Sequence, residues 1–221
     1  MIRVILCDDH ALIRRGLRDT LSDASDIQVV GEAGDYGELR ALMRNLGIAP
    51  GAAGLPCDVL VLDIALPGRS GLDVLHALRD EHSAVRVLVL SMYPQDQYAL
   101  RALKAGAWGY LNKGEDDAQQ IVAAVRAVGA GRKYVTPEIA QMLVDSLTTP
   151  TPENAHERLS DRELQTLQLI AAGRKLSEIA EELKLSPKTV SVYRARVLEK
   201  LGLHNNGELM KYALTHGLVQ G

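Results

Sequence analysis

Cysteine is scarce in this sequence, and long apolar runs are missing from it. The cysteines among its 221 residues, Cys7 and Cys57, stand far apart and form no C-x-x-C motif, which argues against a disulfide scaffold and a structural zinc site. No stretch approaches the ~18 apolar residues that a membrane-spanning helix needs. The first residues show no basic segment followed by an apolar run, as a signal peptide would. We therefore expect a protein of the cytoplasm, a reducing compartment, with no membrane partner.

The residues that are present have the composition of a globular protein, with 47% hydrophobic and 24% charged. At roughly 100–200 residues per domain, the length predicts one or two domains. The net charge of −3 is the sum of −5 for residues 1–155 (15 basic, 20 acidic) and +2 for residues 156–221 (10 basic, 8 acidic). The C-terminal third is only mildly basic, so binding to nucleic acid depends on where its cations lie.

Strand and helix signals alternate over the first 130 residues. Apolar runs typical of strands buried on both faces lie at 4–6, 27–30, 59–62, 85–90 and 110–111. A helical spacing of apolar residues follows each run. Five such units predict an α/β fold with a doubly wound, five-stranded parallel sheet, flavodoxin-like, whose active groups lie beyond the carboxyl ends of the strands. Residues 45–56, rich in Gly, Ala and Pro, predict a longer surface loop.

The alternation stops near residue 129, and the rest of the chain is helical. We assign residues 1–130 to the first domain, residues 131–157 to a linker with a short helix, and residues 158–221 to an all-α, four-helix domain. A capping box at Ser160 and Glu163 begins the first of these helices, and Ser186 followed by Pro187 begins the third. The second helix, near 177–184, and the third form a helix-turn-helix pattern.

Polar residues directly follow four of the predicted strands: Asp8 and Asp9, then Asp63, Ser91 and Lys113. Each alone is most simply a helix cap or a strand-end polar group, but a parallel sheet would bring all of them to one edge. Three neighbouring carboxylates need a counter-charge. Mg²⁺, which prefers oxygen ligands, supplies one, and Lys113 supplies another. A carboxylate held in this way can attack a phosphoryl group and become an acyl phosphate, with Ser91 hydrogen-bonded to a phosphoryl oxygen.

At this point the sequence resembles the receiver domain of bacterial two-component response regulators, over nearly all of residues 1–130. The matching motifs are Asp8-Asp9, Asp63 followed by Leu66-Pro67-Gly68-Arg69-Ser70-Gly71, Ser91, and Gly106-Ala107-Trp108-Gly109-Tyr110-Leu111-Asn112-Lys113. The resemblance implies a receiver-like fold in which Asp63 accepts a phosphoryl group from a sensor histidine kinase.

The same resemblance implies roles for the neighbours of Asp63. The side chains of Asp9 and Asp63 and the backbone carbonyl of Ala65 would bind Mg²⁺, while Asp8 would act mostly through water. Lys113 would pair with the phosphoryl group. Ser91 and Tyr110 would be a switch pair, in which the hydroxyl moves toward the phosphate and the ring turns inward.

The second helix of the helix-turn-helix pattern, residues 188–201, has two different sides on a helical wheel. The core side carries Val190, Val197, Leu198 and Leu201. The outer side carries Lys188, Ser191, Val192, Ala195 and Glu199, flanked by Arg196 and Lys200. Small and polar groups between cations suit a helix that reads a DNA groove, although a plain four-helix domain with a solvated charged face has the same pattern.

The motifs around that helix closely resemble the LuxR-type DNA-binding domain. They are Leu159-Ser160-Asp161-Arg162-Glu163, Glu178-Ile179-Ala180, Ser186-Pro187-Lys188-Thr189-Val190-Ser191-Val192-Tyr193-Arg194 and Lys200-Leu201-Gly202. With the receiver, the whole chain resembles a NarL/FixJ-type response regulator. The resemblance implies that Ser191 and Val192 face bases in the major groove while Lys188, Thr189 and Lys200 contact the DNA backbone. The last helix, through Leu209, Met210 and Ala213, would help to form a homodimer on DNA.

The predicted function is a phosphorylation-activated, DNA-binding transcription regulator that is not an enzyme. Its expected partners are a sensor histidine kinase, double-stranded promoter DNA and a second copy of the chain, with RNA polymerase as a further candidate. One alternative is a haloacid-dehalogenase-type phosphatase, but that chemistry needs a carboxylate where this chain has Ala65. The other alternative, a regulator of the same fold that works without phosphate, stays open.

Overall fold

The computed structural model describes residues 1–48, 56–81, 84–114, 117–148 and 155–219. Most of the loop predicted at 45–56 lies outside these described residues. The chain divides into two compact units, Met1–Thr148 and Thr149–Gly221, and each is described by itself. None of the described helices is both long and apolar enough to cross a lipid bilayer.

The first unit contains a five-stranded parallel sheet in the order β2-β1-β3-β4-β5. Its strands are β1 (Ile2–Cys7), β2 (Ile27–Ala33), β3 (Val59–Leu62), β4 (Arg86–Ser91) and β5 (Gly109–Asn112). All four residues of β3 are buried, as its uninterrupted apolar run requires of a strand covered on both faces, and all four residues of β5 are buried as well. The predicted doubly wound sheet is confirmed.

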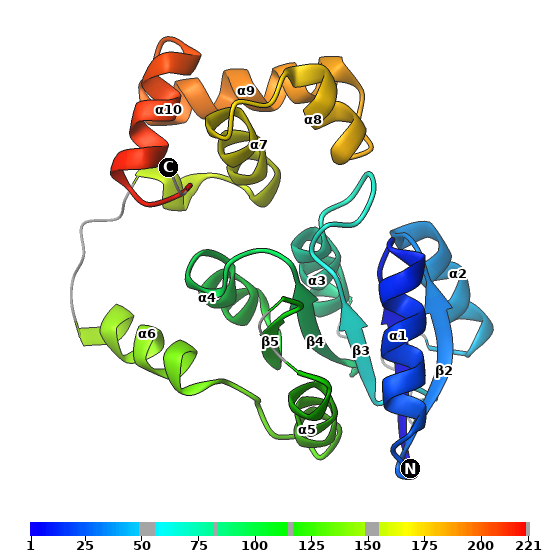
Figure 1. The fold of residues 1–221 in the computed structure, drawn as a ribbon. Helices are drawn as coiled ribbons and strands as arrows, with labels where there is room; N and C mark the ends of the chain where they lie inside the picture. The colour runs from blue at the N-terminus through cyan, green and yellow to red at the C-terminus, as the bar shows by residue number, and fades with distance from the viewer. Residues whose placement is uncertain (49–55, 82–83, 115–116, 149–154, 220–221) are drawn as a thin grey trace. The chain divides into compact units, whose positions relative to one another are not determined.

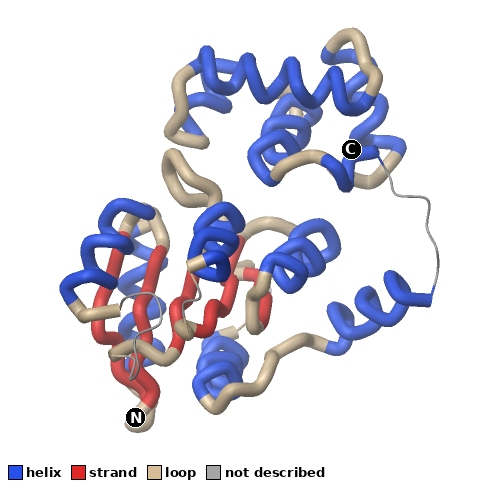
Figure 2. The backbone as a smooth tube through the Cα atoms, turned by 180° about the vertical axis from the view of Figure 1, so that it is seen from behind, coloured by secondary structure: helices blue, strands red, loops and turns tan. Residues whose placement is uncertain are grey.

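Helices cover both faces of the sheet (Figures 1 and 2). They are α1 (Ala11–Ser22), α2 (Tyr36–Asn45), α3 (Gly71–Asp80), α4 (Gln95–Ala105) and α5 (Ala118–Gly129). The chain reverses direction across the sheet after β2, so right-handed crossovers place α1 and α5 on one face and the other three helices on the opposite face. Leu17 and Leu21 of α1 and Val125 of α5 form one apolar core with Val4, Val61 and other strand residues.

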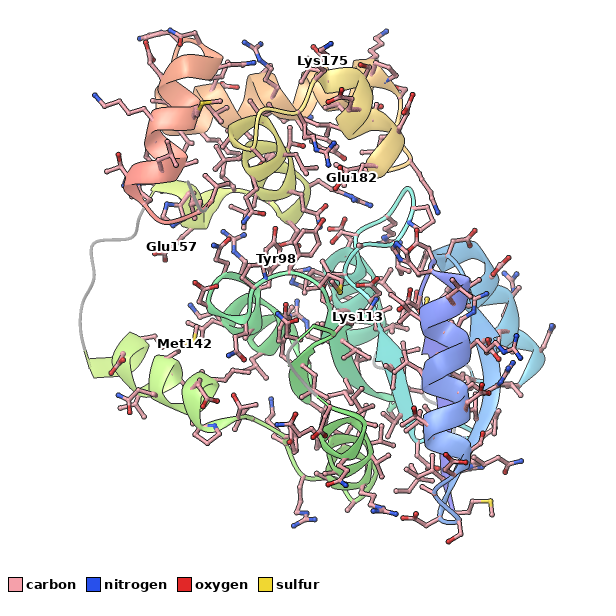
Figure 3. The ribbon with its side chains drawn as sticks, in the orientation of Figure 1. Tyr98, Lys113, Met142, Glu157, Lys175 and Glu182 are labelled. Carbon is pink, nitrogen blue, oxygen red and sulfur yellow. The ribbon has the colours of Figure 1, made fainter. Side chains whose placement is uncertain are left out.

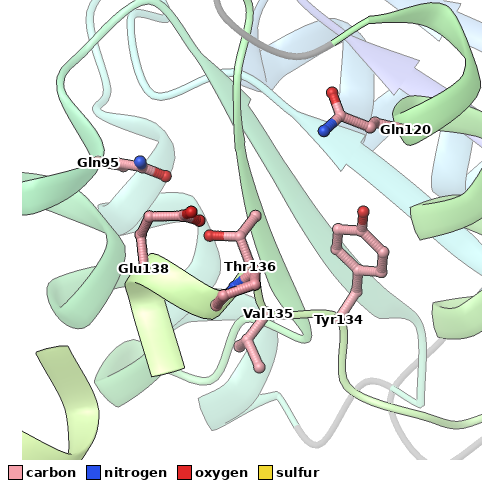
Figure 4. A pocket seen from close by; sticks show the side chains of 7 residues that line it. Gln95, Gln120, Tyr134, Val135, Thr136 and Glu138 are labelled. Carbon is pink, nitrogen blue, oxygen red and sulfur yellow. The ribbon is translucent and has the colours of Figure 1, made fainter. Parts of the chain in front are cut away.

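The segment after α5 returns to the edge of the sheet. Tyr134 forms a parallel bridge with Gly109 of β5, and its N–H donates to the Trp108 carbonyl at 2.8 Å. The helix α6 (Pro137–Thr148) then packs against α4, with Ile139 fully buried. A hollow of about 460 Å³ opens where this segment passes between Gln95 of α4 and Gln120 of α5 (Figure 4). The predicted short helix therefore belongs to the first unit by its packing.

The second unit is helical throughout its described residues: a 3₁₀ turn η1 (Ala155–Arg158), then α7 (Asp161–Ala171), α8 (Leu176–Glu182), α9 (Pro187–Leu201) and α10 (Asn206–Thr215). The predicted helix starts are confirmed. Ser160 and Glu163 form the capping box of α7, and the Ser186 side chain accepts from the Thr189 N–H at the start of α9. Gly202 ends α9 with φ 66°, a left-handed conformation that favours glycine.

Gly71 permits the close approach between α3 and the residue at the end of β3. A Cβ at this position would lie 2.1 Å from the Asp63 carbonyl oxygen and 2.8 Å from Ile64 Cα, which are backbone atoms and cannot rotate away. We expect Gly71→Ala to lower the free energy of unfolding by about 1–3 kcal/mol, measured by urea denaturation, because it overpacks the interior.

Gly16→Ala is the matched control, since a Cβ at Gly16 in the middle of α1 meets nothing within 4 Å. This variant should be more stable than the wild type by about 0.5–1 kcal/mol, because alanine restricts the unfolded chain and favours a helix. Equal stability of the two variants would contradict this account of Gly71.

Candidate functional site

An acidic pocket lies at the carboxyl ends of β1 and β3. The strand register pairs Cys7 with Leu62, so the residues that follow them, Asp8 and Asp63, emerge side by side. The Asp63 N–H donates to the Cys7 carbonyl at 2.9 Å and fixes this arrangement. Lys113, which follows β5, reaches the same end of the sheet (Figure 3). The predicted convergence of these residues is confirmed.

Lys113 forms two ion pairs in this pocket. Its Nζ lies 2.5 Å from Asp8 Oδ2 and 2.7 Å from Asp63 Oδ2, and all three side chains are at most 4% exposed. Burial raises the pKa of Asp63 above its ordinary value, and the neighbouring charge of Asp8 raises it further, whereas Lys113 lowers it. The Lys113 ammonium thus offsets only part of the cost of burying the Asp63 carboxylate, and the net pKa of Asp63 stays above its ordinary value.

The pocket has the donor atoms of a site for a divalent cation. Asp8, Asp9, His10 and Asp63 each bring one ligand atom within 4.8 Å of the others. Three carboxyl groups surround the one lysine ammonium, so a divalent cation would supply the positive charge that Lys113 alone does not. Carboxylate oxygens are the hard ligands that Mg²⁺ prefers, so the residues fit this ion. The Ala65 N–H donates to Asp63 Oδ1 at 3.2 Å, which places the Ala65 backbone beside the phosphoacceptor candidate; the ligand role of its carbonyl stays a prediction.

The switch-pair candidates lie next to the pocket, on β4 and β5. Ser91 is fully buried, and its Oγ accepts from the Tyr93 N–H at 3.2 Å. Tyr110 is fully buried as well, with its hydroxyl donating to the Tyr93 carbonyl at 2.6 Å. Burial raises the pKa of the Tyr110 hydroxyl. The ring predicted to turn inward on phosphorylation is thus already inward in this structure, held by the β4–α4 loop.

Two polar neighbours of the acidic pair complete the turn between β1 and α1. His10 Nδ1 lies 2.7 Å from Asp9 Oδ1, although the His10 side chain is more than half exposed. Arg14 donates to the Asp8 carbonyl from its guanidinium, at 2.5 Å. The sequence analysis missed Arg14, because a helix adjoining a solvated surface commonly carries arginine. The sequence does place Arg14 one turn into the helix that follows Asp8 and Asp9, and this position could have indicated a contact with the acidic pair.

The helix-turn-helix residues lie in the second unit largely as the wheel predicts. Val190, Val197 and Leu198 are buried, while Lys188, Ser191, Val192 and Arg196 are exposed on the other side of α9. Thr189 is partly buried, and its hydroxyl lies 2.8 Å from that of the capping Ser186. Arg194 donates to the Asn206 side chain at 2.6 Å and so joins α9 to α10.

Lys200 has a structural partner that the wheel did not reveal. Its Nζ lies 2.6 Å from Oε2 of Glu163, a residue only 2% exposed, and 3.4 Å from the Arg158 carbonyl. Burial raises the pKa of Glu163, but hydrogen bonds from Lys200 and Ser160 outweigh it, and the net pKa lies below its ordinary value. Lys200 therefore joins the end of α9 to the start of α7 in this structure.

The expected dimer residues on α10 divide into two groups. Leu209 and Ala213 are fully buried within the second unit, so neither is available to a second molecule in this conformation. Met210 is exposed, and Leu214, one turn later, is exposed as well. The resemblance named these residues together, but Leu209 and Ala213 pack inside the unit itself and only Met210 reaches the surface.

Comparisons with known proteins agree with this two-part architecture. Residues 4–126 match the family described as response regulator receiver domain, and residues 157–213 match bacterial regulatory proteins of the luxR family. Response regulator UvrY of Escherichia coli is 37% identical, covering 99% of this chain and 96% of its own length. Response regulator GacA of Pseudomonas protegens is 37% identical, covering 99% of this chain and 98% of its own length.

Solved structures give the same result. The response regulator ChrA of a heme-sensing two-component system is 32% identical, covers 98% of both chains and has a TM-score of 0.51. The RcsB response regulator of Salmonella typhimurium is 26% identical, covers 96% of this chain and 98% of its own, and has a TM-score of 0.57. The chain therefore belongs to the NarL/FixJ-type response regulators, phosphorylation-dependent DNA-binding regulators that join a receiver domain to a LuxR-type helix-turn-helix domain.

Proposed function

We propose that Asp63 is the phosphoacceptor of this response regulator and receives its phosphoryl group from a sensor histidine kinase. The observation that carries the proposal is the buried Lys113 ammonium between Asp8 and Asp63. An ionised Asp63 oxygen forms the new bond to phosphorus, while the bond between phosphorus and the donor nitrogen breaks and its electron pair leaves with the donor. The attacking form is the ionised carboxylate, which needs no base to remove a proton.

The remaining pocket residues stabilise the charge of the transferred group. Asp8, Asp9 and Asp63 would hold Mg²⁺, with the Ala65 carbonyl as a further ligand; the ion supplies positive charge toward the phosphoryl oxygens. Lys113 exchanges one carboxylate partner for a phosphoryl oxygen, which is a stronger acceptor. Because Ala65 stands two residues after Asp63, the chain offers no acid there to release the phosphate, which supports a regulator rather than a phosphatase.

Transmission starts at Ser91. Its hydroxyl turns from the Tyr93 N–H toward a phosphoryl oxygen, which frees the β4–α4 loop to move. The Tyr93 carbonyl binds the Tyr110 hydroxyl, and the Tyr93 ring stacks on Tyr98 of α4 at 4.7 Å between ring centroids. Since α6 packs against α4, a shift of α4 reaches the segment that leads to the second unit.

DNA binding is assigned to α9. Ser191 and Val192 face bases in the major groove, and Lys188 and Arg196 contact phosphates, as their exposed positions on the outer side of the helix allow. The partly buried Thr189, at the start of the helix, is assigned a further contact with the DNA backbone. A structure of RcsB in complex with DNA, 25% identical to this chain with a TM-score of 0.55, supports a DNA-binding role. We assign the homodimer contact to the exposed Met210, with Leu214 added. A two-fold dimer would bind half-sites about one helical turn apart.

Asp63→Asn tests the phosphoacceptor assignment. We expect an acyl-phosphate donor with Mg²⁺ to increase promoter-DNA affinity of the wild type and to have no effect on the variant, because an amide is a poor nucleophile. The measurement is fluorescence anisotropy of labelled DNA with and without the donor. Asp58→Asn is the matched control: Asp58 precedes β3, at the opposite end of the strand, and pairs with Arg3, so this variant should keep the response.

Equal stimulation of Asp63→Asn and wild type would contradict the assignment. Tight DNA binding by both proteins without any donor effect would instead favour a regulator that works without phosphate.

Lys188→Ala and Lys200→Ala separate DNA contact from structural support. Lys188→Ala should weaken binding to all DNA sequences and reduce the slope of log affinity against log salt by about 1, with stability unchanged. Lys200→Ala leaves Glu163 buried without its cation and should lower the free energy of unfolding of the second unit by about 1–3 kcal/mol. Urea denaturation and DNA titrations at several salt concentrations would measure both effects.

The Glu163–Lys200 pair also makes the free energy of unfolding of the second unit depend on pH. Since the pKa of Glu163 in the folded protein lies below its ordinary value of 4.5, its stabilising contribution is complete above pH 4.5 and is lost as the pH falls through the folded pKa. Glu163→Gln should flatten this acid limb of the stability curve. An unchanged acid limb would contradict the proposed pairing.

A further inference from the structure

Arg14, on the second turn of α1, makes two contacts that reach beyond its own helix. Its NH1 group donates to the Asp8 carbonyl at 2.5 Å, and its Nε donates to Glu32 Oε2 at 3.1 Å. The Arg14 side chain is 21% exposed and the Glu32 side chain 29% exposed, so both contacts are partly shielded from water. One guanidinium thus joins the turn of the acidic pair to β2.

A hydrogen bond to the Asp8 carbonyl oxygen affects the geometry of the acidic pocket. The carbonyl belongs to the planar peptide unit that joins Asp8 to Asp9, so fixing its oxygen fixes the plane from which the Asp9 side chain departs. The other side of the turn is fixed by the His10 N–H, which donates to Asp8 Oδ1 at 2.9 Å. Arg14 therefore constrains the directions of two of the three carboxylates.

Glu32 holds Arg14 in the required orientation. It lies on β2 in register with Leu6 of β1, so its backbone is part of the rigid sheet. Its Oε2 accepts from Arg14, and its Oε1 accepts from Arg18 NH1 at 3.1 Å, one helical turn later. Arg18 shares Glu32 with Arg14, but it also donates to Asp19 Oδ1 on its own helix and makes no contact with Asp8 among the described hydrogen bonds.

We propose that Arg14 is a positioning residue for the divalent-cation site, acting through the Asp8 carbonyl to set the geometry of Asp8 and Asp9. This inference rests on the proposed function of the pocket. Arginine suits the task because its planar fork donates in two fixed directions, which a lysine ammonium does not do.

Charge and geometry have opposite consequences for cation binding. The positive charge of Arg14 repels a divalent cation, so its removal would tighten binding if charge alone mattered. Loss of the hydrogen bond to Asp8 releases the turn and weakens binding, as loss of a supporting hydrogen bond commonly does at metal sites. The sign of the change therefore distinguishes the two roles.

The test compares Arg14→Met with Arg18→Met in the full chain. Each variant removes one donor to Glu32 and one positive charge from α1, but only Arg14→Met removes the donor to Asp8. Isothermal titration with Mg²⁺ alone should show about tenfold or greater weakening for Arg14→Met and a Kd within about twofold of wild type for Arg18→Met. Thermal unfolding without Mg²⁺ should show similar Tm values for the two variants.

Arg14→Lys provides a second variant that keeps the charge. It should also bind Mg²⁺ more weakly than the wild type, because one ammonium does not reproduce both contacts. Unchanged or tighter Mg²⁺ binding by Arg14→Met, or equal weakening by Arg14→Met and Arg18→Met, would overturn the proposal. Failure of the wild type to bind Mg²⁺ would overturn the proposed function of the pocket, and this inference with it.

Discussion

The receiver unit depends on one electrostatic constraint, which is that three carboxylates and one ammonium share a nearly dry edge of a parallel sheet. The sheet creates the problem, because its register forces Asp8 and Asp63 to emerge side by side. Lys113 solves part of it by pairing with both. The remaining carboxylate oxygens fit a divalent cation, which the proposed function assigns to this pocket. On this view the reactivity of Asp63 follows from incomplete neutralisation at a rigid place.

The constraint extends along the chain because the elements around the pocket share residues. Lys113 donates its backbone N–H to the Ser91 carbonyl, and Tyr93 receives hydrogen bonds from Tyr110 while donating to Ser91. Tyr93 also stacks on Tyr98 of α4, the helix against which α6 packs. Any rearrangement at Ser91 therefore changes the support of α4. The Tyr110 ring is already inward and bonded to the Tyr93 carbonyl without a phosphoryl group. Under the proposed function, phosphorylation would therefore shift the populations of two existing conformations rather than form this contact anew.

The sequence predicted those features that follow from the spacing of apolar residues and from the position of polar residues directly after strands. Uninterrupted apolar runs predicted five buried strands, and the residues after them predicted the pocket, because carboxyl ends of parallel strands always share an edge. Features that depend on side-chain packing could not be predicted from the sequence. The contact of Lys200 with DNA stays a prediction. A helical wheel shows which side of α9 Lys200 faces, but it cannot show the ion pair that Lys200 forms with Glu163 of α7. The resemblance to LuxR-type domains named Leu209 and Met210 together as dimer contacts, and only packing shows that Leu209 is interior and Met210 is not. Arg14 was missed for the same reason, because its partner is a backbone carbonyl, which every residue has.

Two lysine–carboxylate pairs among the described residues, Lys113–Asp63 and Lys200–Glu163, differ in a way that bears on the proposed function. Glu163 accepts from Lys200 and also from the Ser160 N–H that closes its capping box, and these donors lower its pKa despite burial. Asp63 shares Lys113 with Asp8, and burial together with the Asp8 charge raises its pKa. Glu163 accepts hydrogen bonds from both a lysine and a backbone N–H, so its charge is already stabilised and its role is to join two helices. A carboxylate that shares its one cation with a second carboxylate can still gain from a further positive charge. Under the proposed function, that difference would separate the phosphoacceptor Asp63 from Glu163, which joins two helices.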